Sequence, residues 1–210
     1  MKHIAQLVSG LLVVLSPQLA GASGGTGDSA PAETSSLDPF FAGGRYEAAL
    51  TSGALFSFSG PSENRAPINY TFTGVQLGYM LEDVKGDSWW RGNLELAGEG
   101  FGSAIFGGDG SYISGGTLWL RYNFVPESSH RLVPYAQGGA GCVSTDINHG
   151  IVGQPFNFNL DLGFGVRCLL GRNWSLSLEY RYQHISNAGL NKHNLGINAD
   201  GPILGVSYFF

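Results

Sequence analysis

Residues 156–170 carry the run FNFNLDLGFGVRCLL. Its even positions are apolar from Phe156 to Leu170, and all but one of its odd positions are polar or glycine. Alternation with a period of two places successive side chains on opposite faces of a β-strand. The run is longer than the roughly 5–6 residues of a typical soluble strand and covers the roughly 9–11 that cross a bilayer. It therefore predicts a transmembrane strand with one face toward lipid.

The same alternation recurs along the chain, for example over residues 174–182 and 117–124. Counting such segments gives an even number of strands, as single-chain bacterial barrels have, and short joins mostly alternate with longer ones. We therefore predict an all-β fold, an eight-stranded antiparallel transmembrane β-barrel over residues 42–210. The predicted strands are 43–58, 68–84, 88–106, 111–125, 131–145, 154–170, 172–186 and 198–210.

Composition supports a membrane barrel and excludes other classes. The 210 residues include 11 Lys and Arg, 16 Asp and Glu, 33 Gly, 4 Trp, 9 Tyr and 13 Phe, with a net charge of −5. Such a charge-poor, aromatic-rich chain is not a disordered tail, and it lacks the basic face that binds nucleic acid. A soluble lipocalin-like barrel is the alternative, with the apolar stripe inside. The many glycines on the polar stripe favour the membrane barrel, because they leave room in a narrow lumen.

Both ends of the chain indicate export to the outer membrane of a Gram-negative bacterium. Residues 1–22 have one lysine, a short apolar core and an Ala-Gly-Ala cleavage pattern, which predicts a signal peptide. Residues 23–41 are mainly small or polar and predict a flexible leader. The ending Val206–Phe210 resembles the signal that the barrel assembly machinery recognises, so that machinery and outer-membrane lipids are expected partners. After residue 22 no apolar run is long enough for a transmembrane helix.

Two further expectations concern side chains on the predicted strands. Cys142 should lie opposite about residue 158, which leaves Cys168 too distant for a disulfide, so both thiols are expected to be free. No sequence motif for a metal site is present, and we expect neither metal nor cofactor. A polar network inside the lumen is expected from Glu95, Glu99, Asp161, Arg167, Glu179 and Arg181.

The end of the seventh predicted strand breaks the apolar pattern. By parity, His184 and Ser186 fall on the lipid face together with Tyr180 and Tyr182. Polar groups on that face are costly unless they serve a purpose. If both termini are periplasmic, this strand ends at the outer leaflet, where a Ser–His pair could attack an ester of a membrane lipid. The alternative is that both residues merely contact lipid headgroups.

The run His184–Leu190, followed by Asn194, Gly196 and residue 198, resembles the signature of the PagL family of outer-membrane lipid A 3-O-deacylases. The resemblance implies a serine esterase that hydrolyses the ester-linked acyl chain at the 3-position of lipid A, the lipid part of lipopolysaccharide, without a cofactor. It assigns Ser186 as nucleophile, His184 as base and Asn194 as oxyanion ligand. The backbone N–H groups of Asn187 and Gly189 are further oxyanion candidates.

Asn198 departs from the family pattern, which has a glutamate here to orient the histidine. Asn198 could orient the imidazole as a neutral acceptor; Asp200 could substitute if the strand slips or bulges; or the protein could be weakened or inactive. Glu179 is a poor substitute because its parity places it in the lumen. The competing hypothesis for function is a non-catalytic structural or adhesion barrel of the OmpX kind.

Overall fold

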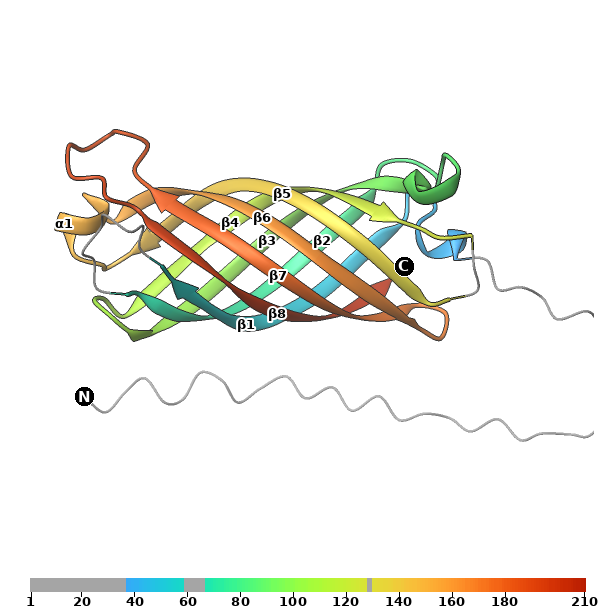
Figure 1. The fold of residues 1–210 in the computed structure, drawn as a ribbon, viewed down its shortest axis with the longest axis horizontal. Coiled ribbons are helices and arrows are strands. Elements are labelled where there is room, and N and C mark those ends of the chain that lie inside the picture. Colours follow the sequence, from blue (N-terminus) through green and yellow to red (C-terminus); the bar gives the residue numbers. More distant parts are fainter. Residues whose placement is uncertain (1–36, 59–66, 128–129) are drawn as a thin grey trace, which may run out of the picture. The chain divides into compact units, whose positions relative to one another are not determined.

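The computed structural model describes residues 37–58, 67–127 and 130–210. The expected signal peptide, and the expected leader as far as residue 36, lie outside the described residues. Eight antiparallel strands pair in sequence order and close into one barrel, because β8 pairs back to β1 (Figure 1). The predicted fold is confirmed. The strands are β1 (Tyr46–Ser57), β2 (Asn69–Met80), β3 (Gly92–Gly107), β4 (Tyr112–Phe124), β5 (Leu132–Thr145), β6 (Phe156–Leu170), β7 (Trp174–Ser186) and β8 (Ile197–Phe209).

The barrel has two unlike ends. One, called the loop end here, carries the β5–β6 connection with the short helix α1 (His149–Val152) and the β7–β8 connection, residues 187–196. The other, the Phe210 end, carries the 3-10 turns η1 (Asp38–Phe40) and η2 (Ser88–Trp90). No helix of the described residues is long and apolar enough to cross a membrane.

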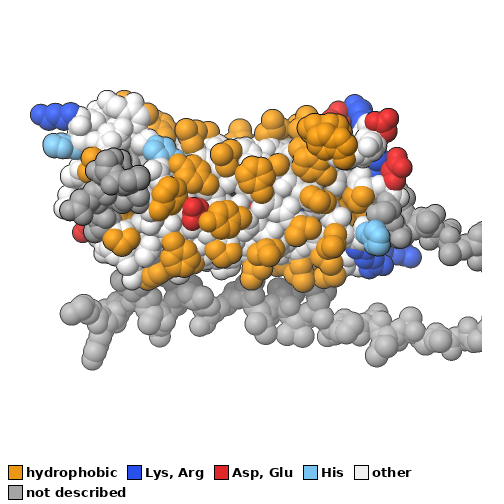
Figure 2. All heavy atoms as spheres, in the orientation of Figure 1, with side chains coloured by type: hydrophobic (Ala, Val, Ile, Leu, Met, Phe, Trp, Pro, Cys, Tyr) orange, Lys and Arg blue, Asp and Glu red, His pale blue; other side chains and the backbone are white. Residues whose placement is uncertain are grey.

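Burial follows the predicted parity. On β4, Leu118 is 59% exposed whereas the adjacent Trp119 is fully buried, and the other strands alternate in the same way. Apolar side chains cover the face of the barrel wall seen in Figure 2, and most of the charged ones on that face gather toward the ends. The apolar stripe therefore faces outward, as in a membrane barrel, and not inward as in a soluble one.

The lumen is filled by a buried polar network, as expected. Arg121 contacts Glu95 at 2.9 Å, and Arg181 contacts Glu99 at 2.8 Å and Glu179 at 2.7 Å. Ion pairs of this kind are stable in a barrel interior only when their remaining groups are also hydrogen-bonded. Further buried partners include Glu47, Gln76, Gln137, Thr117, Asn159, Asp161 and Arg167.

Glycines make space for this network, with an exception on β3. A Cβ at Gly74 would approach Thr51 and Glu99, and one at Gly163 would approach Glu179, so these positions face the lumen. At Gly98, Gly100 and Gly102 a Cβ would meet nothing within 4 Å, and these glycines face outward. The expectation that glycines line the lumen therefore holds for many positions but not for this part of β3.

Apolar clusters close the lumen on both sides of the network. At the Phe210 end, Phe40 and Phe41 pack edge-on against Phe209, and Nη2 of Arg91 donates to both carboxylate oxygens of Asp38. Residues 37–41, which the sequence analysis placed in the flexible leader, are thus part of the packed barrel. At the loop end the cluster includes Tyr70, Phe72, Ile113, Ile185 and Ile197.

The cysteine prediction rests on register, and the register is confirmed. Cys142 pairs with Phe158, and Cys168 pairs with Leu132 at the opposite end of the same strand pair. Both thiols are free.

Candidate active site at the loop end of β7 and β8

The pairing of β7 with β8 places the candidate residues. It runs without a bulge from Trp174↔Tyr208 to Ile185↔Ile197, and within it His184 lies directly opposite Asn198. Directly opposed side chains in an antiparallel pair have Cβ atoms about 4.5–5.5 Å apart, close enough for an imidazole to reach an amide. His184 and Ser186 are half-buried and belong to the outward-facing set of β7.

The imidazole and the amide are joined by a hydrogen bond. His184 Nδ1 lies 2.7 Å from Asn198 Oδ1, and the same oxygen accepts a second hydrogen bond, at 2.9 Å, from the hydroxyl of Tyr182. Because an amide oxygen is only an acceptor, this geometry assigns the Nδ1 proton to His184 and leaves Nε2 unprotonated. An imidazole in that tautomer can accept a proton at Nε2.

Ser186 lies on the same face, one pleat beyond His184. Gly196 approaches both residues: a Cβ there would be 3.4 Å from His184 Cε1 and 3.6 Å from Ser186 Cβ. The backbone of Gly196 has a φ of +68°, which favours glycine. Among the described residues no hydrogen bond joins the Ser186 hydroxyl to His184. The two side chains therefore share a face of β7 but are not hydrogen-bonded to each other.

The loop after Ser186 is built around the Asn187 side chain, which is fully buried. Its Nδ2 donates to Val152 O at 3.1 Å and to His193 O at 2.8 Å, and its Oδ1 accepts from Gly189 N at 2.9 Å. These bonds hold the 187–196 loop against α1. They also support the left-handed φ of 51° at Ala188, which is uncommon for a residue other than glycine.

The three oxyanion candidates prove to be bonded to one another. The Asn187 N–H donates to Asn194 Oδ1 at 3.0 Å, and the Gly189 N–H donates to Asn187 Oδ1. Those two backbone N–H groups are therefore already engaged. The bond to Oδ1 leaves Nδ2 as the end of the Asn194 amide that Asn187 does not use.

Neither carboxylate considered as a substitute for Asn198 reaches His184. Asp200 pairs with Tyr182, one step along β8, and the β7–β8 ladder has no slip or bulge that would bring it opposite His184. Its contact is with Tyr180, the next outward residue of β7. Glu179 lies in the lumen, where it accepts from Tyr135 at 2.8 Å. Asn198 is therefore the residue that orients the imidazole.

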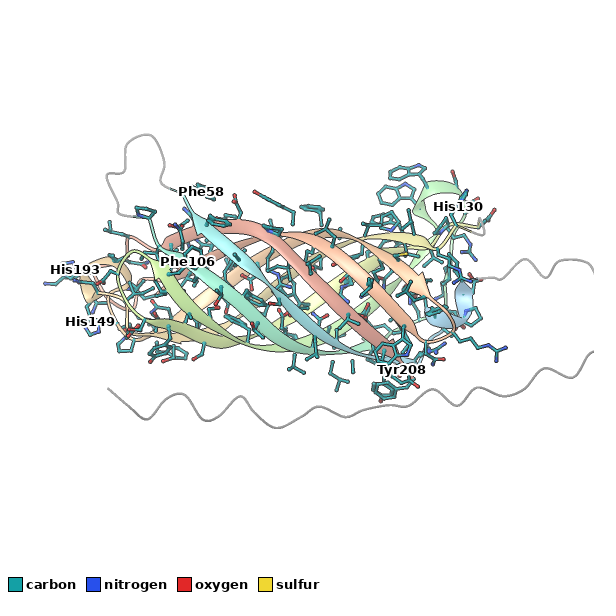
Figure 3. All side chains as sticks on the ribbon, turned by 90° about the horizontal axis from the view of Figure 1, so that it is seen from below. Phe58, Phe106, His130, His149, His193 and Tyr208 are labelled. Carbon is teal, nitrogen blue, oxygen red and sulfur yellow. The ribbon has the colours of Figure 1, made fainter. Side chains whose placement is uncertain are left out.

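The other described histidines lie apart from this site. His149 and His193 lie in the connections of the loop end, and His130 lies at the opposite end (Figure 3). Over the described ranges, no group of three or more His, Cys, Asp or Glu side chains is arranged to hold a metal ion.

Sequence reasoning missed two members of the site. It placed Tyr182 on the lipid face without a role in the site, whereas the hydroxyl of Tyr182 bonds Asn198. It also gave Gly196 no role, although its left-handed φ and the 3.0 Å approach that a Cβ would make to Ile185 O, between His184 and Ser186, favour a residue without a side chain. The parity that Tyr182 shares with His184 was the available signal for the first residue, and the position of Gly196 in the signature was the signal for the second.

Comparison with known proteins gives a family and several structural neighbours. The family model described as "Lipid A 3-O-deacylase (PagL)" matches residues 69–207. The chain is similar to the crystal structure of the outer membrane enzyme PagL, with 18% identity and a TM-score of 0.52 over 77% of this chain and 98% of that one. A search of curated protein sequences found no match.

Two further solved barrels share the fold. Neisserial surface protein A is 14% identical, with a TM-score of 0.55 over 79% of this chain and 97% of that one. The N-terminal β-barrel domain of Pseudomonas aeruginosa OprF is 20% identical, with a TM-score of 0.51 over 80% of this chain and 98% of that one. At these identities the three structures establish the architecture alone.

Proposed function

Since the chain belongs to the lipid A 3-O-deacylase (PagL) family, we propose that it is a serine esterase that removes the ester-linked acyl chain at the 3-position of lipid A. The observation that carries the proposal is the outward-facing His184–Asn198 pair, with Ser186 on the same face at the loop end. An esterase site on the lipid-facing wall meets the acyl chains of a membrane lipid without extracting that lipid from the bilayer.

The proposed chemistry begins with the tautomer of His184. With Nδ1–H donated to Asn198, Nε2 takes the proton of the Ser186 hydroxyl while Oγ attacks the ester carbonyl. A rotation of the Ser186 side chain brings Oγ to Nε2 when substrate binds, since catalytic hydrogen bonds are often long or unformed in a free enzyme.

The tetrahedral intermediate needs a donor for its oxyanion, and we assign the Nδ2 of Asn194 to that role. The proton on His184 then passes to the sugar oxygen, which leaves as an alcohol and takes its electron pair from the breaking C–O bond. Water, deprotonated by His184, hydrolyses the acyl-serine ester and releases the fatty acid. A neutral amide stabilises the transient imidazolium less than a carboxylate does, so we expect a slower enzyme than one with an acidic orienter.

The location in the cell follows the same reasoning. The barrel fold and the family point to the Gram-negative outer membrane. We propose that residues 1–22 direct export, that the barrel assembly machinery inserts the chain, and that the loop end faces the medium. The site then lies in the outer leaflet, where lipopolysaccharide is found.

Mass spectrometry of lipid A tests the proposal directly. Cells with lipid A that retains its 3-position chain would express the protein, the Ser186→Ala variant or the Ser144→Ala variant. Ser144 is a matched control, because it is also an outward-facing serine near the loop end, on β5. The protein and Ser144→Ala should each remove one hydroxyacyl chain, and Ser186→Ala should remove none.

Unchanged lipid A in all three strains, with each barrel folded in the membrane, would reject the esterase. The non-catalytic structural or adhesion barrel would then be the better interpretation. The substitution of asparagine at the orienting position and the fold shared with Neisserial surface protein A are the observations that favour it.

A further inference from the structure

The amide of Asn198 has two unlike ends, and only one of them suits a base at His184. If Oδ1 faces the ring, Nδ1 carries the proton and Nε2 is free to act. If Nδ2 faces the ring, it donates to Nδ1, and the proton moves to Nε2, the nitrogen that should accept from Ser186. In a Ser-His-Asp triad, changing the aspartate to asparagine lowers kcat by about 10⁴ through this wrong tautomer. An asparagine orienter therefore needs a device that holds its oxygen toward the imidazole.

Tyr182 provides such a device. Its hydroxyl lies 2.9 Å from Asn198 Oδ1, the same oxygen that makes the 2.7 Å contact with His184. A phenol is a good donor and a weak acceptor, because its oxygen lone pair is delocalised into the ring. With the amide reversed, Nδ2 could donate to an unprotonated Nδ1 of His184, but it would face the Tyr182 oxygen, a poor acceptor, and the hydrogen bond from Tyr182 would be lost. We propose that Tyr182 is a positioning residue that fixes the oxygen of Asn198 toward His184 and so sets the catalytic tautomer; the catalytic part of this inference rests on the proposed function.

The surroundings of Tyr182 hold its hydroxyl in that role. Its ring packs against Phe58, with ring centroids 6.2 Å apart, and the backbone N–H of Phe58 donates to Asn198 O at 3.0 Å. Asp200, directly opposite Tyr182 in the ladder, is the competing acceptor and lies near both Tyr180 and Tyr182, but the hydrogen bond of the Tyr182 hydroxyl goes to Asn198. The phenol of Tyr182 is directed to the amide and not to the acid.

The tautomer of His184 can be measured without any turnover. The protein would be labelled with ¹⁵N-histidine, folded in detergent micelles and examined by NMR at a pH where the ring is neutral, with His184→Gln used to assign the signal. We expect the Nδ1–H tautomer in the unsubstituted protein and a large shift toward Nε2–H in Tyr182→Phe, which keeps the ring against Phe58. Tyr208→Phe is the matched control, because it removes the hydroxyl of an outward-facing tyrosine at the opposite end of β8, and it should leave the tautomer unchanged. An unchanged His184 signal in Tyr182→Phe overturns the inference.

Activity supplies a second and separate test. A carboxylate presents an oxygen to His184 in either orientation, so it does not need a second residue to hold that orientation. Asn198→Asp should therefore make Tyr182 dispensable for activity. Tyr182→Phe should lower kcat at least about fivefold in the natural background, the loss expected for one hydrogen bond. In the Asn198→Asp background the loss should stay within about twofold, the usual error of additivity. Equal losses in both backgrounds overturn the inference. An inactive parent protein rejects the proposed function, whereas the NMR result still decides the role of Tyr182.

Discussion

The buried side chain of Asn187 offers a direct test of how the 187–196 loop is held. Replacing Asn187 with alanine removes two donors to carbonyl groups, those of Val152 and His193, and the acceptor for Gly189 N. The strands on either side stay paired, because none of these bonds belongs to the barrel ladder. The substitution should therefore release the loop without unfolding the barrel.

The size of the effect follows from the three bonds, which measure 3.1, 2.8 and 2.9 Å. A net contribution of about 1 kcal/mol each gives about 2–3 kcal/mol for local opening. Since about 1.4 kcal/mol is a factor of ten, the open population should rise by roughly 30- to 150-fold. Asn148→Ala is the control at the same end of the barrel. Its side chain makes one exposed bond, to Gly150 N, so its effect should be about fivefold at most.

Native-state proteolysis reports this opening. Trypsin cleaves after Lys192 only when the loop leaves its anchored form, and under conditions of rapid reclosing the cleavage rate follows the open population. The protein would be folded in detergent micelles, and the fragment ending at Lys192 would be followed by mass spectrometry. A cleavage rate in Asn187→Ala equal to that of the parent protein, or an equal rise in Asn148→Ala, would refute the role of Asn187 as the centre of the loop.

Three further predictions concern the site, the lumen and one loop clamp. Gly196→Ala and Gly189→Ala should each destabilise the loop by about 1–2 kcal/mol through a left-handed φ. Only Gly196→Ala should also lower the initial rate of ester hydrolysis, by about tenfold or more, because its Cβ would lie 3.0 Å from Ile185 O and displace the backbone between His184 and Ser186; equal rates in both variants would contradict this. Arg181→Met leaves Glu99 and Glu179 buried without their guanidinium and should lower the free energy of unfolding by about 3–5 kcal/mol. The loss should appear as a lower urea midpoint for the folded band on a gel. An unchanged midpoint would count against a stabilising role of these ion pairs. The Asp146 carboxylate accepts hydrogen bonds from the backbone N–H groups of Ser111 and Tyr112, which hold the pKa of Asp146 below its ordinary value. The stability that these two bonds give the loop is present above that ordinary pKa and is lost as the pH falls through the lowered one. Amide exchange at Ser111 should then accelerate relative to its intrinsic rate, and Asp146→Asn should remove this pH dependence.

Alternation was sufficient to predict the wall of the barrel. The segment 172–186 corresponds to β7, which begins at Trp174, and Cys142 was placed opposite its true partner Phe158. Period-two patterning determines which residues share a face, and face-sharing determines register. The prediction was less accurate between β2 and β3, where strands were expected to reach residue 84 and to begin at residue 88. There the turn η2 intervenes, and a single bridge, Lys85↔Gly92, continues the pairing.

What alternation could not supply was the direction in which a side chain leans and the packing of distant segments. Parity placed Tyr182 on the outer face, but it did not indicate that the phenol would tilt toward Asn198. The packing of Phe40 and Phe41 depends on Phe209, more than 160 residues away, and on the pair between Arg91 and Asp38. Local composition in residues 23–41 carries no trace of these contacts, so the boundary of the packed barrel was misplaced.

The site also shows how a membrane wall can carry polar chemistry. On the lipid face every polar group must find a partner within the protein, because the hydrocarbon offers none. The outward faces of β7 and β8 solve this at the site with neighbours on the two strands, because His184 and Tyr182 share one oxygen of Asn198. A glutamate at residue 198 would place a second carboxylate one pleat from Asp200, and the two like charges would repel each other where little water screens them. A neutral amide avoids that repulsion, but it creates a new requirement, since its oxygen must be held toward the histidine. The phenol of Tyr182 meets that requirement, so Asn198, Asp200 and Tyr182 are best understood as one linked set of side chains along the same pair of strands.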